Sequence, residues 1–116
     1  MKDSQVELFK LQAKICKTLS DYKRLMIIHY LRDGERSVGQ LVTEMGLSQA
    51  NVSQHLAILR EQDIVTARRK GTSIYYSLSS PMIGQACDLV QSVLREQLAK
   101  TQVLAKSIRP VSDKHK

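Results

Sequence analysis

Polar side chains between residues 48 and 55 have the chemistry needed to read the edges of nucleic-acid bases. Gln and Asn amides can make paired hydrogen bonds to adenine, Ser hydroxyls can reach bases or phosphates, and an alanine methyl can contact the methyl of thymine. The candidate residues are Ser48, Gln49, Ala50, Asn51, Ser53, Gln54 and His55. Their types favour contact with double-stranded DNA, with a merely solvated helix face as the alternative.

A second candidate group is basic. Arg68, Arg69 and Lys70 are consecutive, and Thr72 follows them after one glycine. Guanidinium and ammonium groups placed in this way can bind a phosphate backbone or enter a minor groove. The chain as a whole has 18 Lys and Arg against 11 Asp and Glu, a net charge of +7, which favours a polyanionic partner. RNA, an anionic membrane or a plain charged turn are the alternatives.

Motifs for catalysis are lacking. The sequence has no glycine-rich phosphate loop, no Gly-x-Ser-x-Gly and no His-Glu-x-x-His, and its histidines, His29, His55 and His115, are far apart. We therefore predict no enzyme activity, no cofactor and no metal site. Cys16 and Cys87 are too few for a disulfide scaffold and lack Cys-x-x-Cys spacing, so free thiols are expected.

The first and last helices are expected to carry unusually wide apolar faces. Residues 4–19 have two apolar stripes at helical spacing, whereas packing inside one domain requires one. Pro81 suits the first turn of a last helix. Its apolar face consists of Met82, Ile83, Ala86, Cys87, Leu89, Val90, Val93, Leu94 and Leu98. Both helices are predicted to pack against something outside their own domain core.

Between these helices, the pattern predicts a helix-turn-helix. Asp21 can cap a helix that Gly34 ends, and Ser37-Val-Gly-Gln40 fits a capping box for the next helix, which Gly46 terminates. Ser48 then offers a new N-cap for a helix that runs to about Gln62. Two short helices joined by a glycine turn are typical of this DNA-binding motif.

The segment after the helix-turn-helix predicts a β-hairpin. Ile64–Arg69 and Ser73–Leu78 are rich in β-forming residues, and Lys70–Thr72 supplies the glycine of a tight connection. The expected fold is mainly α (α+β): about five helices with a two-stranded hairpin as the wing of a winged helix-turn-helix.

One domain is predicted over residues 1–105, followed by a basic, disordered tail over residues 106–116. Apolar residues make up 42% of the chain, which is typical of a globular protein. The longest apolar run, Leu25–Ile28, is far shorter than the roughly 18 residues of a membrane span. The N-terminus lacks the features of a signal peptide, so we expect a cytoplasmic protein.

The chain resembles the ArsR/SmtB family of winged-helix repressors over about residues 5–100. The residues that carry the resemblance are Leu47–Val65, Arg68–Gly71 and Ile74–Leu78, with Leu19–Leu25 at the entry to the second helix. The resemblance implies a homodimer formed by the first and last helices. It further implies binding to an inverted-repeat operator, and repression that an effector relieves.

The family's effector sites do not transfer to this sequence. Where arsenic and cadmium sensors have a Cys-Val-Cys motif, this chain has Ser37–Val42, and its last helix offers Asp88 and Glu96 without the histidine of zinc and nickel sensors. The cysteine positions of the sulfide-responsive members resemble His29 and Arg95 here. The effector is therefore unknown.

Two other functions remain open. Cys16 and Cys87 lie on the helices that the resemblance places at the dimer interface, where they could approach each other and form a thiol-based redox or metal sensor. Their alternative role is that of small buried apolar residues with inert thiols. A winged helix can also act as a protein-interaction module, which would bind nucleic acids only weakly and without preference.

Overall fold

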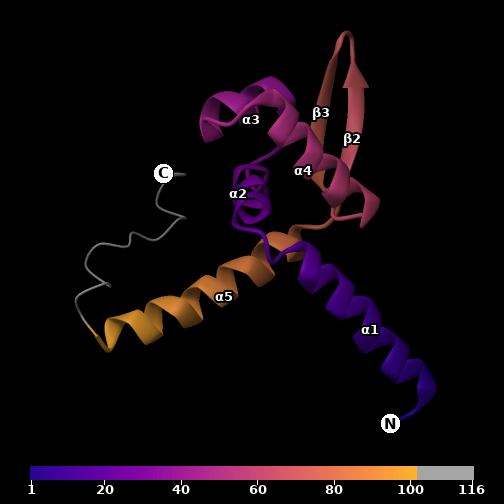
Figure 1. Cartoon of the computed structure of the whole chain (residues 1–116), viewed down its shortest axis with the longest axis vertical. Helices are drawn as coiled ribbons and strands as arrows, with labels where there is room; N and C mark the ends of the chain where they lie inside the picture. Colours follow the sequence, from indigo (N-terminus) through magenta and orange to yellow (C-terminus); the bar gives the residue numbers. More distant parts are fainter. Residues whose placement is uncertain (102–116) are drawn as a thin grey trace.

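The computed structural model describes residues 1–101 and contains five helices and a small antiparallel sheet (Figure 1). In chain order the elements are α1 (Asp3–Thr18), α2 (Tyr22–Tyr30), β1 (Arg36–Ser37), α3 (Val38–Met45), α4 (Gln49–Glu61), β2 (Val65–Lys70), β3 (Ser73–Leu78) and α5 (Pro81–Ala99). The predicted helix count and helix-turn-helix are confirmed. The predicted boundary between residues 105 and 106, and the tail beyond it, lie outside the described residues.

The structure confirms the predicted capping residues at the start of α2 and at both ends of α3. The Asp21 carboxylate accepts hydrogen bonds from the backbone N–H groups of Lys23 (2.8 Å) and Arg24 (3.4 Å) at the start of α2. Ser37 and Gln40 form the expected reciprocal capping box of α3. Gly46 ends α3 in the left-handed region, at φ 67°, which glycine adopts without steric cost.

The wing is the predicted hairpin with one addition. β2 and β3 pair from Val65 with Leu78 to Lys70 with Ser73, and the connecting Gly71 has φ 65°, as the first residue of a tight hairpin turn often requires. A third strand, β1, pairs with the other edge of β3. The sequence did not predict β1 because two residues are too few to show a period.

One helix end differs from the prediction. The second helix, expected to end at Gly34, has its last residue at Tyr30, and Leu31 serves as the C-cap. The N–H of Leu31 bonds to the carbonyl of Ile27 (3.0 Å) and that of Arg32 to the carbonyl of His29 (3.2 Å), so the last turn tightens to i→i−3 bonding and the helix closes before the glycine is reached. Gly34 lies three residues further along, with φ 140°, where it turns the chain toward β1.

The core is closed by residues from α2, α3, α4 and the start of the wing. Its buried apolar side chains are Ile27, Ile28, Leu31, Leu41, Val52, Leu56, Leu59, Ile64 and Val65. Ile83 and Cys87 pack against this cluster from the first half of α5. Burial of Val52, Leu56 and Leu59 fixes the rotation of α4 about its own axis, because these residues lie on one side of that helix.

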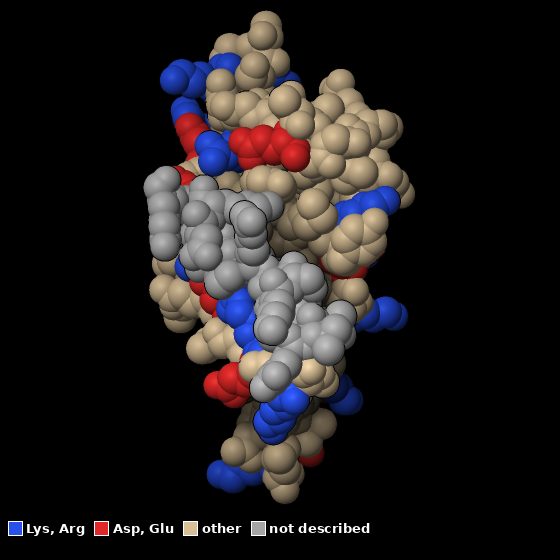
Figure 2. Space-filling model, turned by 90° about the vertical axis from the view of Figure 1, so that its left-hand side faces the viewer, with Lys and Arg blue, Asp and Glu red and all other residues tan. Residues whose placement is uncertain are grey.

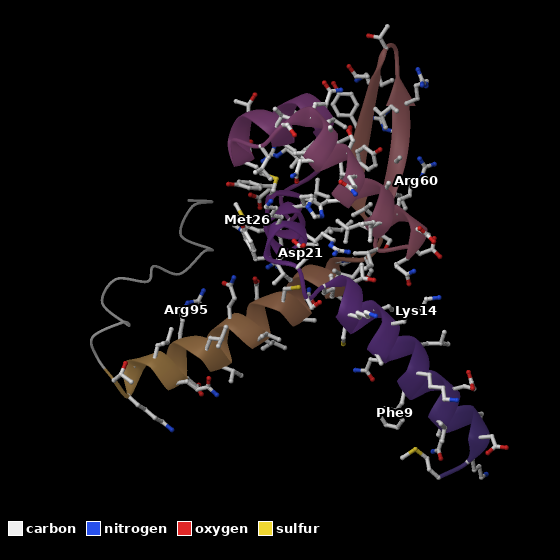
Figure 3. All side chains as sticks on the ribbon, in the orientation of Figure 1. Phe9, Lys14, Asp21, Met26, Arg60 and Arg95 are labelled. Atoms are coloured by element: carbon white, nitrogen blue, oxygen red, sulfur yellow. The ribbon has the colours of Figure 1, made fainter. Side chains whose placement is uncertain are left out.

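The two terminal helices extend away from this core and diverge from each other (Figure 1). Thr18 is the only buried residue of α1, whereas Leu8, Phe9 and Leu11 are each more than half exposed. Phe9 extends from α1 toward the side on which α5 lies (Figure 3). On α5, the exposed apolar residues are Met82, Leu89, Val90, Val93 and Leu94. The unusually wide apolar faces are thus present and uncovered in one protomer.

Among the described residues, no helix is both long and apolar enough to cross a bilayer.

Asp21 should stabilise the fold in two separable ways. Replacement by Ala removes the cap of α2 and should cost about 1 kcal/mol, whereas Asp21→Asn should keep stability near neutral pH because Asn caps almost as well. Burial tends to raise the pKa of Asp21, but the bonds from Lys23 and Arg24 N–H and the charges of His55 and Arg24 outweigh it, so the pKa is lowered.

The lowered pKa sets the sign of the pH dependence. The ionised carboxylate contributes stability above its unfolded pKa, and that contribution is lost as the pH falls below about 4. Denaturant unfolding at several pH values should therefore show that the free energy of unfolding falls less steeply below about pH 4 for Asp21→Asn than for the parent. An unchanged acid profile in Asp21→Asn, with Glu7→Gln as the control on exposed α1, would contradict the role of this charge.

Candidate nucleic-acid interface

One side of α4 is open to solvent and carries most of the predicted base-reading residues. Ser48, Gln49, Ala50, Ser53 and Gln54 are exposed, whereas Asn51 and His55 are half-buried. The Ser48 hydroxyl accepts a hydrogen bond from the N–H of Asn51 at 3.1 Å and thereby caps the helix, which still leaves its O–H able to donate. The exposed side is polar and uncharged through its first two turns, and therefore has the donors and acceptors that base edges require.

Asn51 and His55 lie at the flank of this face, one helical turn apart. Within the described part of the chain, Oδ1 of Asn51 and Nδ1 of His55 are buried without a hydrogen-bond partner. His55 is near enough to Asp21, the cap of α2, to contribute to the lowered pKa of that carboxyl. Its burial differs from that of Gln49, Ser53 and Gln54, which are exposed.

Arg68 is held within the wing by an acidic residue distant in sequence. Its Nε and Nη2 donate to the two carboxylate oxygens of Glu35 at 3.2 Å and 2.5 Å, and its guanidinium lies 5.9 Å from the ring centre of Tyr75. The hydrogen bond from Arg68 lowers the pKa of Glu35, with Lys70 adding to the effect. Arg68 is therefore neutralised locally, unlike the two basic residues that follow it.

Arg69 and Lys70 are exposed at the end of β2 and lie on opposite faces of the hairpin. Arg69 is paired with Ile74 and Lys70 with Ser73, and successive residues of a strand point to opposite sides. Thr72 is exposed in the turn between the strands. Lys and Arg side chains are visible at the upper end of the molecule, where the wing lies (Figure 2). The wing can thus present positive charge on both of its faces.

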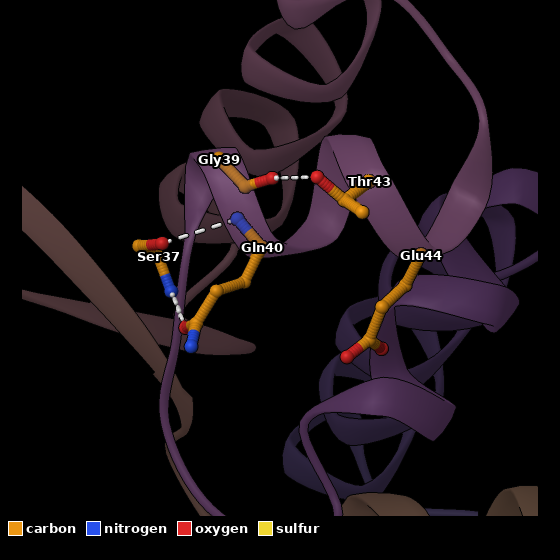
Figure 4. Close-up of a pocket in the computed structure, with 5 residues that line it drawn as sticks. All are labelled: Ser37, Gly39, Gln40, Thr43 and Glu44. Carbon is orange, nitrogen blue, oxygen red and sulfur yellow. Dashed lines mark hydrogen bonds between the residues drawn. The ribbon is translucent and has the colours of Figure 1, made fainter.

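A shallow pocket on α3 offers little for a small ligand. It is lined by Ser37, Gly39, Gln40, Thr43 and Glu44 (Figure 4). The hydroxyl of Ser37 and the side chain of Gln40 are used in the capping box, and Thr43 donates to the carbonyl of Gly39 at 3.1 Å. Glu44 lies 3.8 Å from Nε of Arg36. Ser37, Gln40 and Thr43 are thus engaged in hydrogen bonds within α3 and its cap, whereas Glu44 makes only this longer ion pair.

The two cysteines are placed on α1 and α5, as expected. Cys16 is exposed and Cys87 is half-buried, and both are free thiols. Burial raises the pKa of Cys87, and the neighbouring Asp88 carboxylate raises it further. A thiol with a raised pKa is mostly protonated at neutral pH and reacts slowly. Among residues 1–101, no three His, Cys, Asp or Glu side chains are grouped as metal ligands. The sensor role of Cys16 and Cys87 stays a prediction.

Sequence reasoning missed two residues that shape these surfaces. Glu35 could not be recognised because 33 positions separate it from Arg68, and only the pairing of β1 with β3 brings them together. Gly84 did give a signal: a glycine inside a helix is less stable than alanine by roughly 1 kcal/mol and often marks a close approach. In the structure, the side chain of Arg32 lies against it.

Comparison with known proteins agrees with this geometry. Residues 21–67, from the cap of α2 into β2, match the model of the arsR family of bacterial regulatory proteins. The chain is 35% identical over 103 residues to Rv0081, a helix-turn-helix transcriptional regulator of Mycobacterium tuberculosis, covering 88% of this chain and 90% of that protein. The crystal structure of Rv0081 has a TM-score of 0.74, with 83% of this chain and 97% of that chain covered.

Two further relatives extend the comparison. The solution structure of the homodimeric winged helix-turn-helix domain of Mb0332 from Mycobacterium bovis has a TM-score of 0.75 and 33% identity, with 84% of this chain and 91% of that chain covered. The arsenical resistance operon repressor of Escherichia coli is 32% identical over 101 residues, 86% of each chain. These matches and the winged helix-turn-helix fold establish that the chain belongs to the ArsR family of DNA-binding transcriptional regulators, which are not enzymes.

Proposed function

We propose that this regulator is a homodimeric repressor that binds an inverted-repeat operator in double-stranded DNA. The observation that carries the proposal is the exposed polar face of α4, held outward by the burial of Val52, Leu56 and Leu59 on its other side. A helix presented in this way fits the major groove and meets base edges with its first turns. We refer to α4 as the recognition helix from here on.

The uncovered faces of α1 and α5 support the dimer. Large apolar side chains on both helices are in solvent in one protomer, and such contiguous surface is typical of a protein interface. A second copy offers the same stripes in return, and the related Mb0332 domain is homodimeric. Two-fold symmetry then places two recognition helices against successive major grooves, which an inverted repeat matches.

Repression follows from occupancy of a promoter and needs no chemical step. Such a protein acts where the chromosome lies, in the cytoplasm, and an effector of unknown identity would release it. The predicted base contacts are Ser48, Gln49, Ala50, Asn51, Ser53, Gln54 and His55, with Arg69, Lys70 and Thr72 of the wing at the phosphate backbone. Arg68 joins this second set only if DNA displaces it from Glu35.

Selection of bound duplexes from a random DNA pool tests the proposal. With the reduced protein at near-physiological salt, we expect enrichment of an inverted repeat, and transcription in vitro from a promoter overlapping that repeat should fall when the protein is added. Uniformly weak binding to all duplexes would favour the protein-interaction module instead. If the protein instead stimulates transcription from that promoter, the proposed DNA binding would stand and the proposed repression would be refuted.

Replacement of Gln54 should change the preferred bases. Its amide is exposed on the recognition helix, and loss of one paired contact to a base costs about 1 to 3 kcal/mol. Binding of Gln54→Ala to the selected duplex and to its single-base variants should reveal one position at which discrimination disappears. Equal weakening on every sequence would refute base reading by Gln54, and Glu61→Gln at the other end of the same helix serves as the control.

The wing residues should differ in their effect on the salt dependence of binding. Arg69→Ala should lower the slope of log K against log salt by about one unit, because one phosphate contact is lost. Arg68→Ala should leave the slope nearly unchanged because Glu35 already neutralises Arg68. Glu35→Gln should raise nonspecific affinity by freeing that guanidinium. Equal slope changes for the two arginines, with Lys14→Ala on α1 as the control, would contradict this assignment.

A charge on the apolar face of α1 should dissociate the dimer. Phe9 is 56% exposed in one protomer, and Phe9→Glu would bury a carboxylate at the proposed interface. Sedimentation velocity should report monomers for Phe9→Glu and dimers for Lys10→Glu, which places the same group on the polar side of the helix. A dimer in both variants would show that α1 does not contribute to the interface.

A further inference from the structure

The first turn of α5 is fixed to the body of the protomer by backbone and hydroxyl contacts. The hydroxyl of Ser79 donates to the carbonyl of Asp63 (2.6 Å) and its backbone N–H donates to the carbonyl of Ile64 (3.0 Å), whereas Ser80 caps the helix by accepting from the N–H of Met82 (3.2 Å). These bonds hold one end of the helix. Ile83 and Cys87 also pack against the core from the first half of the helix, so the direction of the part that leaves the core depends on contacts beyond them.

Directly after Cys87, two turns into α5, Asp88 forms an ion pair with Arg32. Arg32, which follows the C-cap of α2, donates from Nη1 to Oδ2 of Asp88. The side chain of Arg32 is 29% exposed and that of Asp88 is 51% exposed, so solvent partly screens the pair. Such a pair adds little to global stability. Its position, however, links the end of α2 to the middle of a helix that otherwise leaves the core.

Gly84 gives Arg32 its path to Asp88. It is buried in α5, and a Cβ there would overlap Cδ and Nε of Arg32 and stand 3.1 Å from Cζ. The stem of Arg32 therefore lies directly on the backbone of α5. Glycine is unfavourable inside a helix relative to alanine, and close approach of another group is the physical reason for one at this position.

We propose that Arg32, Gly84 and Asp88, here called the α2–α5 joint, set the separation of the two recognition helices in the dimer. This inference rests on the proposed function. Apart from Met82 in the first turn, the large exposed apolar residues of α5 all follow the joint, from Leu89 to Leu94, and face the partner in the proposed dimer. A change in the direction of α5 would therefore move the whole winged body relative to the partner, and the spacing of the half-sites follows from that geometry.

Operators with varied spacers test the joint. The two half-sites selected by the parent protein are separated by spacers that change in steps of one base pair. The parent should prefer one spacing, and Asp88→Asn should weaken that preference by roughly two- to fivefold, the effect of losing a partly exposed ion pair. Glu96→Gln, with the same charge change on the same helix, should retain the preference of the parent.

Each outcome has a distinct meaning. An unchanged spacing preference in Asp88→Asn would contradict the proposed role of the joint. Loss of the dimer by Asp88→Asn in sedimentation would also contradict it, because the ion pair would then be needed for assembly rather than for spacing. Absence of any inverted repeat in the selection with the parent would refute the proposed function instead.

A double-mutant cycle tests whether Gly84 acts through Arg32. Gly84→Ala alone should displace Arg32 and weaken the spacing preference as Asp88→Asn does. In an Arg32→Ala background, Gly84→Ala should leave the spacing preference unchanged and raise the melting temperature, because alanine favours the helix. The same loss of preference from Gly84→Ala in both backgrounds would show that the glycine does not act through Arg32, and would contradict the proposal.

Discussion

Burial of apolar surface is the interaction on which the rest of this structure depends. The residues of α2, α3, α4 and β2 enclose the core of one protomer, and α1 adds only Thr18 to the buried set. A helix of 16 residues is close to the length at which isolated helices are marginal in water, so α1 requires a partner for its apolar stripes. The same holds for the outer row of α5. In the proposed dimer a second copy of the chain covers the apolar faces of both helices, which is why we connect assembly with function.

The same burial gives the recognition helix its orientation. Three buried residues hold one side of α4 in the core, and the opposite side is left to polar groups that hydrogen-bond without net charge. Positive charge lies instead on the wing, where Arg68 forms a salt bridge with Glu35, whereas Arg69 and Lys70 form none among the described residues, although Lys70 is near enough to Glu35 to lower the pKa of that carboxyl. In the proposed complex, base reading and phosphate binding would therefore fall to different elements, and the Glu35–Arg68 pair would reduce the charge that the wing offers to DNA.

Local sequence signals predicted most of this fold. The features that the sequence did not predict depend on contacts between residues far apart in the chain. Asp21, Ser37, Ser48, Gly46 and Gly71 each act over a few residues, so their types and spacing were sufficient to place the helices and the wing. The end of α2 differed because its C-cap bonds close the helix before Gly34. Strand β1 and the pairs Glu35–Arg68 and Arg32–Asp88 join positions brought together only by folding, and no local pattern predicts them. The residues predicted to contact bases lie on α4 or at its cap and are exposed there, apart from the half-buried Asn51 and His55, and their contact with DNA stays a prediction.

The central claim is that the dimer holds two recognition helices at the separation of one turn of DNA. Its most direct measurement is the distance between spin labels attached at Ala57→Cys, an exposed position of α4, in a protein that also carries Cys16→Ser and Cys87→Ser. Pulsed dipolar spectroscopy of the doubly labelled dimer should give one narrow distribution centred near about 34 Å, allowing for the label linkers. Absence of dipolar coupling, or a distribution without a maximum in that range, would contradict the account.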